Sequence, residues 1–297
     1  MFRLAHVTDP HFRGFREIRP LDFAGKRAVG LANLVVNRTR KHKMDLLEDL
    51  RRDLRAVAPD HLALTGDLSN VSINGEWRVA LAWLDLCGLA PDAVTVIPGN
   101  HDAYVAQVVT DRTFEKLFAS YQTSDVDRDP DTAYYPFVQI RDKLALIGVS
   151  SAVATGDLGA WGEIGEAQLR RLEDLLQSPQ LASLMRVVLL HHPPVVHKGG
   201  EHRNLRDRDA FAGVLARAGA DLVLHGHDHQ DERGELAGPG GKPIPIVGGG
   251  SASYAGDLDR RARYNVFEIE GTTITWTTRV QDPATTFFRE VRRERLV

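Results

Sequence analysis

The chain has 297 residues, of which 43% are hydrophobic and 26% are charged, and its formal net charge is −3. This composition is typical of a soluble globular protein with one large α/β domain or two small ones, and the net charge gives no general indication of nucleic-acid binding. No stretch reaches the roughly 18 apolar residues of a membrane span, and the N-terminal apolar run is too short for a signal peptide. The one cysteine, Cys87, cannot form an intramolecular disulfide. We therefore expect a cytoplasmic protein.

Short apolar runs alternate with amphipathic helical stretches along the chain. We expect strands at residues 4–8, 61–65, 93–97, 134–140, 144–150, 187–190, 222–224, 244–247, 264–269, 273–280 and 285–291. We expect helices at residues 46–57, 76–87, 169–176 and 210–218. The alternation predicts an α/β layered fold, and the β-rich end predicts a second sheet within one domain that spans residues 1–297.

A basic segment at about residues 12–43 does not fit a compact core. It carries nine basic residues against two acidic ones, and its residues 31–36 are mostly apolar. We expect a basic helical insert with one of three roles. It could be a hairpin that covers the sheet edge, a protein interface, or a surface for peripheral contact with an anionic membrane, to which each Lys or Arg contributes on the order of 1 kcal/mol.

Carboxylates follow the first two predicted strands. Asp9 and His11 come directly after the strand at 4–8, and Asp67 follows Gly66 after the strand at 61–65. A carboxylate and an imidazole two residues apart can face one site, and an aspartate behind a sharp glycine turn can bridge two cations. Each motif alone is also consistent with an ordinary turn, because Asp and Gly are common turn residues.

A third motif, at residues 98–102, follows the strand at 93–97 and is more specific. Asn100 offers a neutral oxygen ligand, and His101 is a candidate acid or electrostatic donor. Asp102 could hold the other nitrogen of the His101 ring and fix its tautomer. The alternative is a Pro-Gly-Asn turn with a surface histidine.

Histidines cluster after the strands at 187–190 and 222–224. His191 and His192 precede two prolines, and His225, His227 and His229 stand at alternate positions. Alternate histidines around a glycine are hard to explain by core packing. Oxygen and imidazole ligands without thiolate suit Mn, Fe or Zn, and strand ends are where open α/β sheets place their ligand sites.

The order and types of these five motifs resemble the calcineurin-like metallophosphoesterases. The family pattern runs Asp-x-His, Gly-Asp, Gly-Asn-His-Asp/Glu, His-x-Pro and Gly-His-x-His, and here it spans residues 9–229. Residues 65–69, 98–102 and 191–194 are most similar to the bacterial cyclic-nucleotide phosphodiesterase branch, class III. The resemblance implies an α/β (α+β) fold, a four-layer α-β-β-α sandwich with two central mixed β-sheets.

The resemblance also implies a binuclear metal centre. The first metal would be held by Asp9, His11 and His229, the second by Asn100, His191 and His227, and Asp67 would bridge them. The ligand in His-x-Pro is the histidine two residues before the proline, so His192 is expected beside the ligand His191. His225 lies outside the pattern and is interpreted as structural. Asn70 and His192 are expected to bind substrate, and further candidates for the pocket are His197, Arg203 and Tyr254.

Two cations roughly 3.5–4 Å apart can lower the pKa of a bridging water, neutralise charge on the phosphate oxygens and hold the ester in line. We expect the bridging hydroxide to attack phosphorus directly, since no Gly-x-Ser-x-Gly motif is present and Cys87 lies away from every motif. His101 would stabilise the developing charge or protonate the leaving oxygen, with Asp102 orienting its ring.

The metal core does not select a substrate, because phosphomonoesterases, phosphodiesterases, nucleases and pyrophosphatases share it. The branch resemblance favours a phosphodiester, such as a cyclic nucleotide or a glycerophosphodiester. The basic insert departs from that branch and indicates an alternative, a pyrophosphatase acting on a lipid-linked nucleotide sugar of the UDP-diacylglucosamine type at the inner face of a membrane. A nuclease is a further alternative, although no stable nucleic-acid partner is expected. A non-catalytic metal-bound scaffold is disfavoured, because every expected ligand is present.

Overall fold

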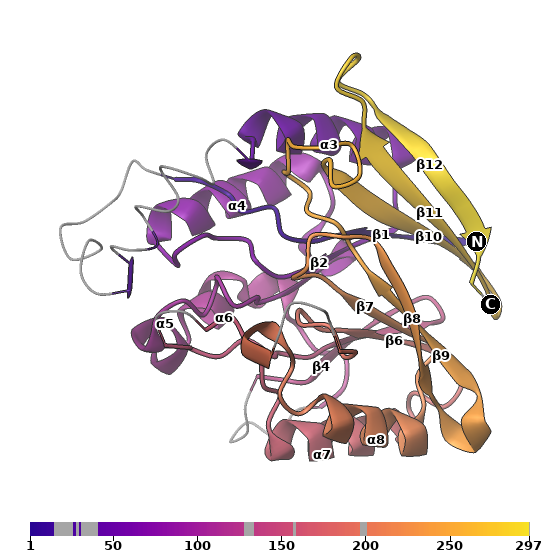
Figure 1. Ribbon diagram of the computed structural model, residues 1–297. Helices are drawn as coiled ribbons and strands as arrows, with labels where there is room; N and C mark the ends of the chain where they lie inside the picture. Colours follow the sequence, from indigo (N-terminus) through magenta and orange to yellow (C-terminus); the bar gives the residue numbers. More distant parts are fainter. Residues whose placement is uncertain are drawn as a thin grey trace.

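The computed structural model describes residues 1–14, 26–27, 30, 41–127, 134–156, 159–196 and 201–296. The described residues form two six-stranded sheets (Figure 1). The first has the order β12-β11-β10-β1-β2-β3, made of β1 (Phe2–Val7), β2 (His61–Thr65), β3 (Val94–Ile97), β10 (Arg263–Glu270), β11 (Thr273–Gln281) and β12 (Phe288–Arg295). The second has the order β4-β5-β6-β7-β9-β8, made of β4 (Phe137–Arg141), β5 (Leu144–Gly148), β6 (Met185–Leu189), β7 (Leu222–His225), β8 (Glu232–Ala237) and β9 (Pro243–Gly248).

Both sheets are mixed. In the first, β1, β2 and β3 are parallel, and β10 joins β1 from the other side as an antiparallel neighbour. In the second, β5, β6, β7 and β9 are parallel, and β4 and β8 are antiparallel edge strands. The carboxyl ends of the parallel strands in each sheet therefore point the same way, which is the arrangement that gathers loops into one site.

Helices cover the outer face of each sheet. The longer ones are α3 (Met44–Val57), α4 (Asn74–Cys87), α7 (Glu166–Leu176) and α8 (Arg208–Ala218). Figure 1 shows α3 and α4 over the first sheet and α7 and α8 over the second. In α3 the buried residues are spaced by one helical turn, which gives the helix one apolar face: Leu46, Leu47, Leu50 and Leu54.

The alternation of side chains along a strand builds three apolar layers. In β1, Ala5 and Val7 pack in the core that includes α3 and α4, whereas Leu4 faces the core between the sheets with Phe267 and Trp276. A third core lies between the second sheet and its helices. The predicted four-layer sandwich with two mixed sheets is therefore confirmed.

Some elements differ from the sequence expectation. The edge strand β8 was not expected, because its charged residues alternate between half-buried and exposed and give no apolar run. The short helices α5 (Ala106–Thr110) and α6 (Thr113–Leu117) each bury one side chain, which is too little for a helical period. The last strand begins at Phe288 because residues 282–287 form a hydrogen-bonded turn.

Most of the predicted basic insert lies outside the described residues, so its helical character stays a prediction. Of its described parts, residues 41–43 run beside residues 253–255, where His42 and Tyr254 form an isolated bridge. The remaining short 3-10 turns are η4 (Pro91–Ala93), η5 (Ala119–Tyr121), η6 (Glu201–Arg203) and η7 (Pro239–Gly241). Within the described parts of the chain, no helix is long and apolar enough to cross a membrane.

Candidate metal centre

The seven predicted ligands all follow carboxyl ends of strands, and both sheets contribute. Asp9 and His11 follow β1, Asp67 follows β2, Asn100 follows β3, His191 follows β6, and His227 and His229 follow β7. The loop after β9 completes the group, because the Ser251 hydroxyl donates to the backbone oxygen of Asp9 at 2.7 Å. The fold therefore brings together ligands that are scattered along the sequence.

Five of these ligands have a left-handed backbone: Asp9 (φ 51°), His11 (φ 49°), Asp67 (φ 55°), His227 (φ 76°) and His229 (φ 54°). Residues with a Cβ rarely adopt this conformation, and it concentrates at functional sites. The turns after β1, β2 and β7 thus aim side chains into one space instead of continuing the strands.

Gly66 lets three loops meet at this point. Its φ is +93°, and a Cβ there would lie 2.5 Å from the Gly99 nitrogen and 2.7 Å from Nδ1 of His191. Any side chain at this position would push apart the loops after β2, β3 and β6.

The first predicted cluster is assembled in the structure. His229 Nε2 lies 3.2 Å from Asp9 Oδ1 and 3.2 Å from His11 Nε2, and His11 Nε2 lies 4.0 Å from Asp9 Oδ1. Atoms that bind one cation at roughly 2.1 Å are about 3–4 Å from one another, so these three residues can hold one ion. One ligand atom from each of Asp9, His11, Asp67 and His229 lies within 4.8 Å of all the others.

The second predicted cluster is equally close. Asn100 Oδ1 lies 3.0 Å from His227 Nδ1 and 3.2 Å from His191 Nε2. The two clusters share Asp67, whose Oδ1 is 3.4 Å from His191 Nε2 and whose Oδ2 is 3.9 Å from His11 Nε2. Asp67 is thus placed to bridge.

Backbone carbonyls fix the tautomers of two ligands. Nδ1 of His191 donates to the Thr65 oxygen at 2.7 Å, and Nδ1 of His11 donates to the Ser69 oxygen at 3.2 Å. A carbonyl can only accept, so the neutral rings carry their lone pairs on Nε2, which faces the clusters.

The electrostatics of the site favour positive charge. Burial lowers the pKa of His191, but the Asp67 carboxylate outweighs it and raises that pKa to about 9. Burial likewise raises the pKa of Asp67, yet His191, His101 and His11 hold it well below its usual range. Asp67 and His191 therefore share a proton between them, at the position that a cation would occupy.

The donor set fits two metal ions. With a neutral His191, its Nε2, Asn100 Oδ1 and Asp67 Oδ1 are all electron-pair donors that face one another, and a cation between them removes the repulsion. Buried Asp9 Oδ1 accepts no hydrogen bond from the described residues, as expected of an oxygen reserved for a metal. Oxygen and imidazole donors suit Mn, Fe or Zn.

The hydrogen-bond partners of Asp102 differ from the predicted one, which was the His101 ring. Nδ1 of His101 donates to the backbone oxygen of Asn70 at 2.6 Å, so a carbonyl and not Asp102 fixes the His101 tautomer. The Asp102 carboxylate accepts instead from the backbone nitrogens of Leu68, Ser69 and Gly99. Asp102 therefore ties the loops after β2 and β3 together and does not orient the His101 ring. His101 itself lies against the first cluster, with its ring centroid 5.3 Å from that of His11.

The two predicted substrate contacts, Asn70 and His192, already make hydrogen bonds within the protein. The Asn70 amide donates to the backbone oxygens of His11 and Phe12, at 3.2 and 2.9 Å, and Asn70 is buried. Both ring nitrogens of His192 have partners, the Ser151 hydroxyl at 2.8 Å and the Ala160 oxygen at 3.2 Å. His192 lies in a group of three histidines whose nitrogens are close enough for a metal, but both of its ring nitrogens already have partners within the protein, and its ring packs against that of His227.

Among the further candidates, Arg203 and Tyr254 do lie beside the centre. Arg203 donates to the backbone oxygen of His227 at 3.4 Å, and Tyr254 packs against His42 with ring centroids 5.7 Å apart. His197 lies outside the described residues. His42, which sequence reasoning did not select, packs against both His11 and His229. It stands in a basic run without a motif, so no sequence signal marked it.

The family of the chain follows from a comparison with known sequences. The sequence profile of the calcineurin-like phosphoesterases matches residues 2–231, which include all seven predicted ligands. The chain belongs to the calcineurin-like phosphoesterase family. No curated protein matches it.

Two solved structures share the fold of this calcineurin-like phosphoesterase. A dimetal phosphatase from Danio rerio has a TM-score of 0.62 and 15% identity, over 98% of each chain. The purple acid phosphatase PPD1 from yellow lupin (Lupinus luteus) has a TM-score of 0.58 and 13% identity, over 97% of this chain and 52% of its own. This chain thus spans about half the length of the lupin enzyme. Family membership makes a phosphoester the substrate class, whereas the cyclic-nucleotide branch stays a prediction.

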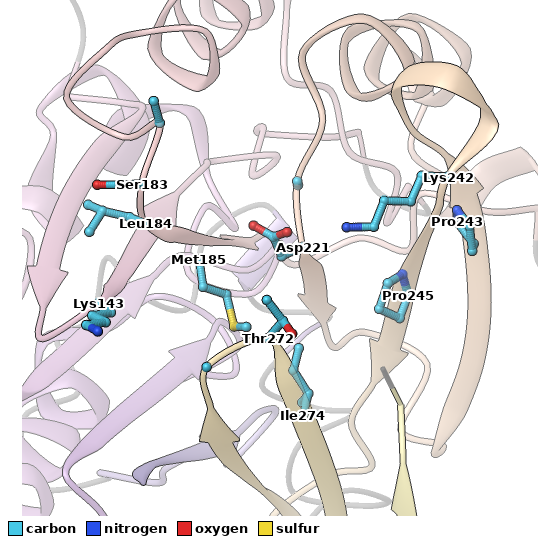
Figure 2. A pocket seen from close by; sticks show the side chains of 13 residues that line it. Lys143, Ser183, Leu184, Met185, Asp221, Lys242, Pro243, Pro245, Thr272 and Ile274 are labelled. Carbon is cyan, nitrogen blue, oxygen red and sulfur yellow. The ribbon is translucent and has the colours of Figure 1, made fainter.

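A pocket of about 320 Å³ lies away from the seven predicted ligands, none of which lines it. It is lined by residues at the amino ends of strands in the second sheet, among them Met185, Asp221 and Pro243 (Figure 2). Its one carboxylate, Asp221, already accepts from the Arg186 backbone nitrogen at 2.8 Å. This pocket therefore belongs to the opposite end of the second sheet and contributes nothing to the centre.

Proposed function

We propose that this calcineurin-like phosphoesterase is a binuclear metal-dependent phosphodiesterase. The observation that carries the proposal is the pair of ligand clusters that share Asp67, with His101 packed beside the first of them. Asp9, His11 and His229 would hold one metal, and Asn100, His191 and His227 the other. When bound, two such cations activate water and neutralise charge on the phosphoryl oxygens.

The described residues supply the remaining chemistry through His101. Because Nδ1 of His101 donates to the Asn70 carbonyl, Nε2 is the atom that can carry and release a proton. His101 would donate this proton to the leaving alkoxide, which an unactivated ester requires. Asn70 holds the ring through its carbonyl and the first motif through its amide, so it sets the distance between the acid and the first cluster.

A covalent thiol intermediate is disfavoured. Cys87 is buried at the end of α4, away from the clusters, and burial raises the pKa of its thiol to about 12. A thiol of this kind is not a nucleophile near neutral pH. Direct hydrolysis by water is the simpler route.

The preference for a diester rests on the motif resemblance to the cyclic-nucleotide phosphodiesterase branch. The test compares bis-p-nitrophenyl phosphate with p-nitrophenyl phosphate on the purified chain with added Mn²⁺. We expect kcat/KM to be at least about tenfold higher for the diester, a difference of about 1.4 kcal/mol in transition-state binding. A preference for the monoester would contradict the assignment. If the diester is preferred, a panel of cyclic nucleotides and glycerophosphodiesters would then identify the substrate.

One observation favours a second candidate, a pyrophosphatase that acts on a lipid-linked nucleotide sugar. Lys26 of the basic insert lies over the ring of Tyr104, 4.4 Å from its centroid, and this ring stacks on His101. An ammonium so close to the acid could meet a second phosphoryl group of a pyrophosphate. The test compares the hydrolysis rates of a UDP-sugar lipid, single-stranded DNA and simple diesters, with and without anionic vesicles. The fastest substrate would be the UDP-sugar lipid for a pyrophosphatase, DNA for a nuclease and a simple diester for the diesterase.

A further inference from the structure

His42 enters the metal centre from the end of the basic insert. The backbone nitrogen of Lys43 donates to the Ser253 oxygen at 2.9 Å, and the nitrogen of Ala255 donates to the Lys41 oxygen at 2.6 Å. These two hydrogen bonds flank the bridge between His42 and Tyr254. The short strand-like pairing fixes the backbone of His42, whose exposed fraction is 6%.

The His42 ring converges with two ligands of the first cluster. It meets the ring of His11 edge to face at 4.8 Å and the ring of His229 edge to face at 5.4 Å. One nitrogen of each of the three rings lies within 4.8 Å of the other two. His42 Nδ1 lies 2.9 Å from the Ser253 hydroxyl, which resembles the polar partners that orient His11 and His191.

We propose that His42 is a further ligand of the first metal, an inference that rests on the proposed binuclear centre. One nitrogen of each of the three rings lies within 4.8 Å of the other two, which is close enough for all three to share one cation. His42 would then give the first metal a third imidazole beside His11 and His229, whereas the second metal would have two imidazoles.

This difference makes the two metal positions unequal. An imidazole-rich position favours Zn, Fe or Ni over the oxygen-preferring Mg or Mn. The first position should therefore hold its metal more tightly and select it more strongly. His42 would couple this selectivity to the basic insert, because the insert ends at the ligand itself.

The test measures metal binding and not turnover. Wild type and His42→Ala are dialysed against a buffered chelator over a series of free Zn²⁺ concentrations, and bound metal is counted by elemental analysis. We expect wild type to bind two equivalents with unequal affinity. In His42→Ala the tighter equivalent should weaken at least by the roughly 10–100-fold that loss of an outer partner produces.

Three further variants keep the result interpretable. His61, in β2, is another fully buried histidine, and its Nε2 lies 2.7 Å from Thr95 Oγ1 in β3. His61→Ala removes this imidazole and should leave both metal affinities unchanged. Ser253→Ala should weaken the tighter site by a smaller factor. His42→Gln retains most of the buried volume, and the Co²⁺-loaded protein should show a changed visible absorption spectrum if a ligand has been lost.

The outcomes separate the inference from the proposed function. Unchanged affinities and an unchanged Co²⁺ spectrum in the His42 variants would overturn the inference, even if turnover fell, because His42 would then act on substrate. A wild-type chain that binds fewer than two metals would instead overturn the binuclear centre. A selective loss at the tighter site would support both.

Discussion

Replacing Asp102 tests whether this buried carboxylate positions the centre or takes part in catalysis. Asp102 is 1% exposed. Its Oδ2 accepts from the backbone nitrogens of Leu68 and Gly99, both at 3.0 Å, and its Oδ1 accepts from the Ser69 nitrogen and hydroxyl, both at 2.8 Å. One side chain thus ties the loop after β2, which carries Asp67, to the loop after β3, which carries Asn100.

The magnitude follows from the donors that each variant leaves unpaired. Asp102→Ala leaves three buried backbone N–H groups without an acceptor, each worth about 1–3 kcal/mol. Local relaxation recovers part of the sum, so we expect a loss of about 3–5 kcal/mol in the free energy of unfolding. In Asp102→Asn the retained oxygen can serve Leu68 and Gly99, and the Ser69 hydroxyl can accept from the new amide. One backbone donor is lost, and we expect a loss of about 1–3 kcal/mol.

The assay is urea unfolding of the chelator-treated proteins at pH 7.5. Burial raises the pKa of Asp102 to about 6, so the carboxylate is mainly ionised under these conditions. A loss below about 1 kcal/mol for Asp102→Ala would refute the positioning role. An Asp102→Ala variant with wild-type stability but lost turnover would instead indicate a catalytic role for Asp102, as the sequence alone suggested.

His101→Ala should keep two metals by elemental analysis but lose about 10²–10⁴-fold in kcat on a diester with a poor leaving group; an equal rate would remove its role as acid. Exhaustive chelation should abolish turnover and Mn²⁺ should restore it, whereas activity in protein shown to be metal-free would contradict a metal mechanism. Burial raises the pKa of Glu76 from 4.5 to about 7, so the folded protein loses stability as pH rises from about 4.5 through 7. Glu76→Gln cannot ionise, and its stability relative to wild type should therefore rise by up to about 3 kcal/mol between pH 4.5 and 8, measured by urea unfolding; a flat difference would contradict the shift.

The strands that precede the predicted ligands have a simple signal in the sequence. All residues of β2 and β3 are buried, as expected for parallel strands covered on both faces, and each gives a short apolar run that ends at a ligand loop. Strand ends and residue types marked the motifs, and the family resemblance implied the seven ligands; the structure brings these residues together, and their role as metal ligands stays a prediction. The proposal of one domain over residues 1–297 follows from the same pattern and stays a prediction.

The sequence could not show which polar groups meet across the loops. Asp102 is adjacent to His101 in the chain, which suggested a pair, but the turn after β3 aims the carboxylate back at the backbone of Ser69. The His101 ring reaches the carbonyl of Asn70, 31 positions away. His42 has no motif, and only its pairing with residues 253–255 brings it to His11. Such contacts depend on tertiary structure and leave no local pattern.

The two sheets have to dock before either cluster exists. The first sheet supplies Asp9 to the first cluster and Asn100 to the second, and the second sheet supplies His229 and His227 to the same two clusters. The hydrogen bond from the His227 nitrogen to Asp9 Oδ2, at 3.0 Å, crosses this junction. Packing between the sheets therefore sets the separation of the ligands, and a close-packed core resists small changes in it. The rigid apolar layer is what allows strained loops from distant parts of the chain to present their donors at distances suited to a pair of cations.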